Sequence, residues 1–288
     1  MANALDSTTT TALVARYDGF LLDAYGVLVH GGGAFDGAAA FLRDLDERGK
    51  RWCIVSNDAS KTPEHAAARY RHLGLPVRDE QVVNAGMLLP EAFARHGLQG
   101  ARVRVMGPTD ARTLVERAGG VAVDLGDPDF QALVLADESG YPLLQVLDDT
   151  LTAVIDLTEN GQPPVLLVPN PDLAYTRGPG LYGFAAGSLA AMLQAALDQR
   201  LGHNAPQFEA LGKPHPALFR LGLQRLGLEK QRVVMVGDQL ATDVRGGQAA
   251  GLDTVLVGYG VGRWRASEGE SGGKQTSDVV PTWLLDAL

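Results

Sequence analysis

Short apolar runs alternate along the chain with longer segments whose apolar residues recur at helical spacing, a pattern typical of alternating strands and helices. The runs predicted as strands are 20–22, 52–55, 102–106, 133–135, 165–168, 233–236 and 254–257. The segments predicted as helices are 38–48, 63–72, 110–117, 143–157, 189–201, 216–226 and 242–250. This alternation predicts an α/β fold with mainly parallel sheets.

Length and composition narrow the class of protein. The 288 residues, 45% of them hydrophobic, suffice for one large or two ordinary domains. The net charge of −9 argues against a nucleic-acid partner, because an acidic surface repels phosphate backbones. We expect no membrane partner, since no apolar stretch reaches the ~18 residues of a bilayer span. The polar N-terminus lacks the apolar segment of a signal peptide, which predicts a cytoplasmic protein.

Polar and acidic residues follow three of the predicted strands. They are Asp23 after the first run, Ser56-Asn57-Asp58 after the second, and Gly237-Asp238 with Asp243 after the run 233–236. Because ligands bind beyond the carboxyl ends of the strands in parallel α/β sheets, these side chains predict one shared site. Asp and Ser also cap helices and begin turns, but three such strand ends together favour a site.

These residue types suit phosphoryl transfer assisted by a metal ion. Two carboxylates at adjacent strand ends can hold Mg²⁺, which prefers oxygen ligands, and one carboxylate can attack phosphorus as a nucleophile. The transferring group needs donors, which the Ser56 hydroxyl, backbone N–H groups and Lys213 could supply. The other interpretation of Lys213 is a solvated surface lysine.

Four segments in order resemble the motifs of the haloacid dehalogenase (HAD) superfamily. They are Asp23-Ala24-Tyr25-Gly26-Val27-Leu28, Ser56 to Pro63, Gly212-Lys213-Pro214, and Gly237 to Asp243. The segment inserted between the second and the third resembles that of the class IIA, NagD-like branch of sugar phosphatases. The resemblance covers about residues 15–262. It implies a Rossmann-like core over 15–84 and 186–288, with a C2-type α/β cap over 85–185 that determines substrate specificity.

We expect residues 1–14 to form a flexible N-terminus, whose first part, Met1 to Thr11, is polar and rich in Thr. The segment 264–278, rich in Gly, Ser and charged residues, is predicted to be a loop. A homodimer formed through the cap is compatible with the resemblance.

The resemblance assigns a metal site and a nucleophile. Asp23 would be the nucleophile and an Mg²⁺ ligand, and Asp238 the second carboxylate ligand. Asp243 would lie beside them, either as a further Mg²⁺ ligand or as a residue that positions a ligand. Tyr25 would contribute only its backbone carbonyl.

The resemblance also assigns the phosphate-binding residues. Ser56, with the backbone of Asn57, would bind the transferring phosphoryl group, and Lys213 would neutralise charge between this group and the nucleophile. In the cap, Asn170 and Asp172 follow a predicted strand, so they are candidates to face the substrate. An Asx turn explains that pair equally well.

Tyr25 departs from the phosphatase pattern, which places an aspartate there as general acid and base. A phenol has an ordinary pKa of ~10 and cannot readily transfer a proton at neutral pH. Loss of such help typically costs ~10²–10⁴ in rate. Asp58, where the branch usually has Asn, is a candidate replacement; its other interpretation is a cap for the helix beginning near Pro63.

The leading hypothesis is Mg²⁺-dependent hydrolysis of a small, sugar-phosphate-like metabolite through an aspartyl-phosphate on Asp23. Two alternatives follow from Tyr25. The stretch Asp23-Ala24-Tyr25-Gly26 also resembles the motif of 2-haloacid dehalogenases, which use no metal. A protein that binds a phosphorylated metabolite without catalysis is the second alternative.

Overall fold

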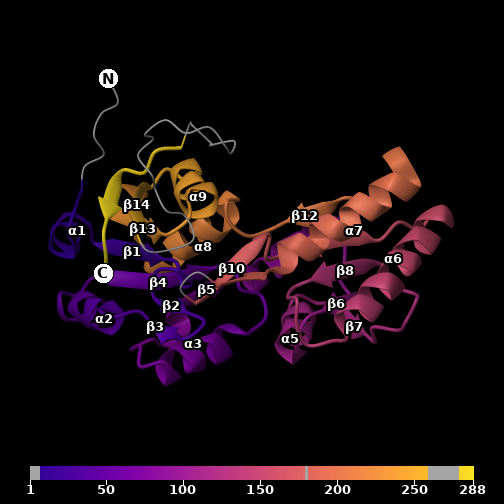
Figure 1. The fold of residues 1–288 in the computed structure, drawn as a ribbon, viewed down its shortest axis with the longest axis horizontal. Helices are drawn as coiled ribbons and strands as arrows, with labels where there is room; N and C mark the ends of the chain where they lie inside the picture. Colours follow the sequence, from indigo (N-terminus) through magenta and orange to yellow (C-terminus); the bar gives the residue numbers. More distant parts are fainter. Residues whose placement is uncertain (1–6, 179–180, 259–278) are drawn as a thin grey trace.

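Two α/β units lie side by side in the computed structural model, which describes residues 7–178, 181–258 and 279–288 (Figure 1). Each unit is built on its own parallel sheet. We call the unit that carries both described ends of the chain the core, and the unit inserted into it the cap. Two short antiparallel hairpins lie outside these sheets, β2 (Val29–His30) with β3 (Gly33–Ala34) and β10 (Ala174–Gly178) with β11 (Leu181–Phe184).

The core sheet has six parallel strands in the order β15-β14-β13-β1-β4-β5. Their bounds are β1 (Gly19–Leu22), β4 (Arg51–Ser56), β5 (Val82–Asn84), β13 (Val233–Gly237), β14 (Asp253–Val257) and β15 (Trp283–Leu285). The core helices are α1 (Thr10–Arg16), α2 (Ala38–Glu47), α3 (Pro63–His72), α8 (Pro216–Leu226) and α9 (Arg245–Ala249). Buried residues of α1, α2 and α3 pack with one face of the sheet and those of α8 with the other, so β1 is buried along its whole length.

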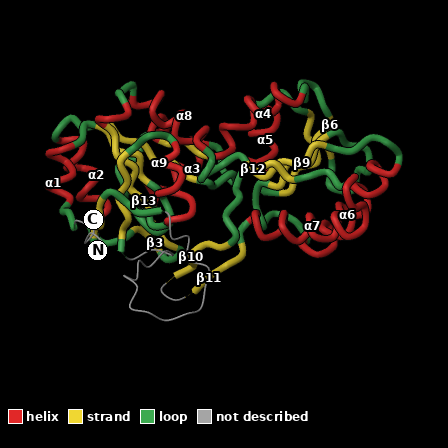
Figure 2. The backbone as a smooth tube through the Cα atoms, turned by 90° about the horizontal axis from the view of Figure 1, so that it is seen from above, coloured by secondary structure: helices red, strands yellow, loops and turns green. Residues whose placement is uncertain are grey.

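The cap sheet has five parallel strands in the order β12-β9-β8-β6-β7. Their bounds are β6 (Arg102–Met106), β7 (Val121–Val123), β8 (Ala132–Leu135), β9 (Val165–Val168) and β12 (Phe208–Ala210). Helices α6 (Leu143–Glu159) and α7 (Ala186–Leu201) cover one face, and α4 (Leu89–His96) and α5 (Thr109–Arg117) the other (Figure 2). Short 3₁₀ or π turns complete the chain at Asp79–Gln81, Ala85–Leu88, Gly202–Asn204, Lys230–Arg232 and Leu240–Val244. In the part of the chain that the structure describes, every helix falls short of the length and apolarity of a bilayer span.

Core and cap share one cluster of buried apolar side chains. Leu21 and Phe219 of the core belong to the same cluster as Phe93 and Leu114 of the cap. The hairpin β10–β11 also reaches from the cap to β2–β3 of the core (Figure 2), where the backbone of Arg177 passes Gly31 so closely that a Cβ there would lie 2.0 Å from the Arg177 carbonyl oxygen. The two units are therefore joined by packing as well as by the connecting chain.

The structure corrects two of the predicted boundaries. The cap does not end at residue 185, because α7 and β12 belong to it and the chain returns to the core near residue 211. Leu193 and Leu197 of α7 pack in the apolar cluster of the cap, whereas helical periodicity indicates only that a face is buried and not which sheet it covers. The N-terminus is helical from Thr10, and its Leu13 and Val14 are buried. The predicted loop 264–278 lies outside the described residues.

Candidate active site

Three strand ends converge at one edge of the core sheet. Strand β1 lies between β13 and β4, with Leu22 opposite both Val236 and Ile54. The Asp23 N–H donates to the Val236 carbonyl at 2.9 Å. Because all three strands are parallel, the residues that follow them lie at this edge, as the sequence predicts.

The acidic residues at this edge surround one lysine. Carboxylate oxygens of Asp23, Asp238 and Asp243 lie within 4.8 Å of one another, and all three residues are buried. Lys213 Nζ donates to Asp23 Oδ1 at 2.6 Å and to Asp243 Oδ1 at 2.7 Å. The Lys213 side chain is only 3% exposed, so the interpretation of this residue as a surface lysine is wrong.

Burial and charge act in opposite directions on this cluster. Burial lowers the pKa of Lys213, but the charges of Asp23, Asp243 and Asp172 outweigh that effect and hold the pKa above its usual value. Burial raises the pKa of Asp23 to about 7 in spite of the lysine. Three buried carboxylates face one ammonium, and an oxygen-liganded divalent cation would balance the charge that remains. The donor set therefore fits Mg²⁺.

Glycines bring the backbone close to these carboxylates. Gly26 has φ 89°, and a Cβ there would lie 2.2 Å from Asp238 Oδ2. The turn that carries Asp23 thus packs directly against Asp238. Both oxygens of Asp243 accept hydrogen bonds, Oδ1 from Lys213 and Oδ2 from the backbone N–H groups of Asp238 at 3.2 Å and Gln239 at 3.1 Å.

The Asn57 side chain connects three segments of the site. Its Oδ1 accepts the Lys213 N–H at 2.7 Å, while Nδ2 donates to the Lys213 carbonyl at 3.1 Å and to Asp172 Oδ1 at 3.0 Å. The sequence suggested only a backbone role for Asn57. The neighbouring Ser56 is buried at the end of β4, and its Oγ accepts the Asp58 N–H at 3.2 Å.

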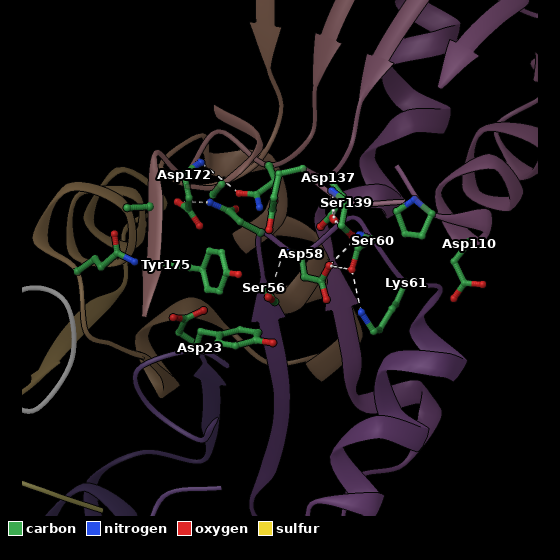
Figure 3. A pocket seen from close by; sticks show the side chains of 18 of the residues that line it. Asp23, Ser56, Asp58, Ser60, Lys61, Asp110, Asp137, Ser139, Asp172 and Tyr175 are labelled. Atoms are coloured by element: carbon green, nitrogen blue, oxygen red, sulfur yellow. Dashed lines mark hydrogen bonds between the residues drawn. The ribbon is translucent and has the colours of Figure 1, made fainter. Parts of the chain in front are cut away.

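A cavity of ≈ 500 Å³ opens from these strand ends towards the cap (Figure 3). Its walls include Asp23, Tyr25, Ser56, Asn57, Asp58, Asn170 and Asp172 from the sequence-based set. Asn170 Oδ1 accepts the Asp172 N–H at 3.1 Å, so the pair forms an Asx turn and also lines the cavity. The structure adds lining residues to which the sequence assigned no role, namely Ser60, Lys61, Asp110, Asp137, Glu138, Ser139 and Tyr175.

Tyr25 is held by aromatic and cationic neighbours. Its ring packs edge-on against Tyr175 at 6.4 Å between centroids, and the Arg69 guanidinium lies 5.3 Å from its ring centroid. Burial raises the pKa of the Tyr25 phenol above its usual value. The phenol is therefore an even weaker proton donor at neutral pH than an exposed tyrosine.

Asp58 faces the cavity rather than capping a helix. Its Oδ1 accepts the Ser60 N–H at 2.8 Å and the Ser60 hydroxyl at 2.6 Å (Figure 3). The N-cap of α3 is Thr62, whose side chain accepts the His65 N–H. The interpretation of Asp58 as the helix cap is therefore wrong.

Comparison with known proteins identifies the family. The model of the haloacid dehalogenase-like hydrolases matches residues 20–120, and a second HAD-hydrolase-like model matches 210–287. The chain is 30% identical to dihydroxyacetone phosphatase from Corynebacterium glutamicum (84% of this chain, 81% of that protein) and 28% identical to acid sugar phosphatase from Staphylococcus aureus (85% and 88%).

Solved structures show the same fold. A possible sugar phosphatase of the HAD superfamily from Cytophaga hutchinsonii superposes with a TM-score of 0.83 at 27% identity, over 99% of this chain and 98% of that one. NagD from E. coli shares the fold, with a TM-score of 0.72 at 23% identity over 94% and 97% of the two chains. The chain therefore belongs to the haloacid dehalogenase-like hydrolases, in their class IIA branch, and is a hydrolase of small phosphate monoesters.

Proposed function

We propose that this enzyme hydrolyses a sugar-phosphate-like metabolite through an aspartyl-phosphate on Asp23, with Mg²⁺ as its cofactor. The observation that carries the proposal is the buried contact of Asp23 with Lys213, beside Asp238 and at the base of a cavity large enough for a small metabolite. The names of the two relatives, a dihydroxyacetone phosphatase and an acid sugar phosphatase, support this class of substrate.

Asp23 and Asp238 would hold the metal ion, together with the Tyr25 carbonyl. Asp243 would lie beside them, as a third ligand or as a residue that positions the site through its hydrogen bonds to Lys213 and to the backbone N–H groups of Asp238 and Gln239. When bound, Mg²⁺ would supply Lewis-acid stabilisation of the charge on the phosphoryl oxygens.

The first step is an attack of one Asp23 carboxylate oxygen on phosphorus. The bond from phosphorus to the ester oxygen breaks, and the leaving group departs with that electron pair. Lys213 Nζ, the Ser56 hydroxyl and the Asn57 backbone N–H stabilise the negative charge of the transferring group. A water molecule then attacks phosphorus, releases inorganic phosphate and restores the Asp23 carboxylate.

An alkoxide leaving group also needs a proton, and Tyr25 is a poor donor of one. We assign this transfer to the Asp58 carboxyl group, which lines the same cavity and is oriented by Ser60. The same carboxylate would then accept a proton from the attacking water.

Metal-free dehalogenation is the weaker alternative for Asp23. The three clustered carboxylates match a cation site, and both curated relatives described above are phosphatases. Dehalogenation would leave Asp238 without a function in the reaction.

A panel of phosphate monoesters, assayed with Mg²⁺ and with a chelator, tests the proposal. We expect hydrolysis of sugar-phosphate-like esters that the chelator abolishes. Asp23→Asn should lower kcat/KM by about 10³-fold or more while the protein keeps its fold by circular dichroism. The exposed Asp36→Asn is the matched control and should act like the wild type. Hydrolysis that persists in the chelator or in Asp23→Asn would contradict the proposal.

A further inference from the structure

The wall of the cavity opposite the strand ends is acidic. Asp137 and Glu138 follow β8 of the cap, and both line the cavity. We call this pair the acidic wall. Among the described residues that line the cavity, Lys61 of the core is the one with a basic side chain. Figure 3 shows Asp137 across the cavity from Asp23, with Asp58 between them and Lys61 on the side of Asp58 away from Asp23.

Hydrogen bonds within the cap fix the loop that carries the acidic wall. Asp137 Oδ1 accepts the Ser139 N–H at 3.0 Å and the Ser139 hydroxyl at 2.6 Å. The Tyr141 hydroxyl donates to the Asp137 carbonyl at 2.9 Å. The negative charge of the wall is therefore presented by a structured turn, and not by a side chain on an unconstrained loop.

The described neighbours compensate the charge of the wall only in part, through the nearby Lys61. Lys61 Nζ donates to the Ser60 hydroxyl at 3.0 Å, and within the described residues neither Asp137 nor Glu138 forms an ion pair. The nearby Asp110 differs, because its Oδ2 accepts the Thr62 N–H at 3.1 Å and contacts His65 Nδ1 at 2.6 Å. Asp110 thus joins cap to core, while the wall faces the space that a leaving group would occupy.

The acidic wall does not have the arrangement of a second metal site. Among the described residues, the group of carboxylates close enough to share an ion is Asp23, Asp238 and Asp243. The wall carboxylates do not converge in this way, so they present a diffuse negative field and hydrogen-bond acceptors.

We propose that the acidic wall, with Glu138 as its specificity-determining residue, selects leaving groups that carry hydroxyl groups and rejects those that carry a second negative charge. The inference rests on the proposed function, because it concerns what lies beyond the phosphoryl group bound at Asp23. A carboxylate or second phosphate on the leaving group would meet like charge in a partly buried cavity, which opposes binding. Hydroxyl groups would instead donate hydrogen bonds to the wall.

Two substrates that differ by one group test this selectivity. Glycerol 3-phosphate carries a hydroxymethyl group where 3-phosphoglycerate carries a carboxylate. We expect the wild type to favour glycerol 3-phosphate in kcat/KM by about 10-fold or more, and Glu138→Gln to reduce that ratio about 10-fold. Glu116→Gln removes the same charge from an exposed position of α5 outside the cavity and should leave the ratio unchanged.

The pH dependence of this ratio is a second readout. Burial, together with the charges of Asp137 and Asp58, raises the pKa of Glu138 to about 7 against the opposing effects of its own backbone N–H and of Lys61. Glu138 is then protonated in acid and ionised in base. The preference for glycerol 3-phosphate should therefore grow from about pH 6 to about pH 8, and Glu138→Gln should flatten that increase. Titration of the phosphate itself affects both substrates and cancels in the ratio.

Failure of this inference is distinguishable from failure of the proposed function. Equal kcat/KM for both esters, or a ratio that Glu138→Gln leaves unchanged, would overturn the proposed selectivity of the acidic wall. Neither result would contradict the proposed phosphatase activity. Absence of hydrolysis of both esters by the wild type would instead count against the proposed function. Binding of the two esters to Asp23→Asn protein, measured by calorimetry with Mg²⁺, gives the selectivity without turnover, and equal affinities there would also overturn the inference.

Discussion

At the scale of single residues, the proposed mechanism assigns the proton of the leaving group to Asp58 and not to Tyr25. An aryl phosphate leaves without a proton, whereas an alkyl phosphate leaves as a basic alkoxide. Asp58→Asn should therefore lower kcat for alkyl esters by ~10²-fold or more and that for aryl esters much less. Tyr25→Asp should then bring little gain. Steady-state assays of both variants on both ester types provide the measurement, with the exposed Asp148→Asn as control.

Equal losses on aryl and alkyl esters in Asp58→Asn would show that this residue does not transfer the proton. A large gain for alkyl esters in Tyr25→Asp would show that the proton donor is missing in the wild type.

The sequence predicts some residues of the site and misses others for a physical reason. Asp23 and Asp238 could be found because parallel strands end at one edge of the sheet, so a residue directly after a predicted strand is expected at that edge. Asn57 binds the Lys213 backbone across 156 positions of sequence. No local pattern encodes such a contact, and the same holds for Tyr175 and Glu138, which only the placement of the cap brings to the cavity.

At the scale of elements, the turn after β1 must pack against Asp238 for the site to form. Gly26→Ala would force an alanine into a backbone conformation with positive φ, and its Cβ would lie 2.2 Å from Asp238 Oδ2. We expect a loss of about 1–3 kcal/mol in the free energy of unfolding, measured by urea denaturation, and a fall in activity of about 10-fold or more.

Gly74→Ala separates the effect of backbone strain from the effect of the close contact with Asp238. Gly74 has φ 86°, and a Cβ at this position would have no described atom within 4 Å, so the substitution introduces the backbone strain alone. Activity in Gly26→Ala equal to that of Gly74→Ala would show that close packing on Asp238 is not needed.

Elements were predicted more reliably than their assembly. The helix at 189–201 follows from its periodicity, and the structure places α7 over Ala186–Leu201. Its assignment to the core was wrong, because amphipathicity does not identify the sheet on which a helix packs. The short strands β12 and β15 were missed, since three residues are too few to show a period.

At the scale of the whole molecule, ligand binding should stabilise the folded protein by mass action. On the proposed function, Mg²⁺ and inorganic phosphate would bind the folded protein and not the unfolded chain, so together they should raise the Tm by a few degrees, and a chelator should reverse the shift. Asp238→Asn should lose most of the shift while Asp36→Asn keeps it. Differential scanning calorimetry gives the measurement. A full shift of the Tm in Asp238→Asn would show that this carboxylate does not bind the metal ion.

In the proposed mechanism, Asp23 carries the phosphoryl group during turnover. The direct measurement is an acid quench of the enzyme during hydrolysis, followed by borohydride reduction and peptide mass spectrometry, since reduction of an aspartyl-phosphate converts the aspartate to homoserine. We expect homoserine at position 23, in a yield that requires substrate and Mg²⁺. Homoserine at another aspartate, or none at any quench time while phosphate is released, would contradict it.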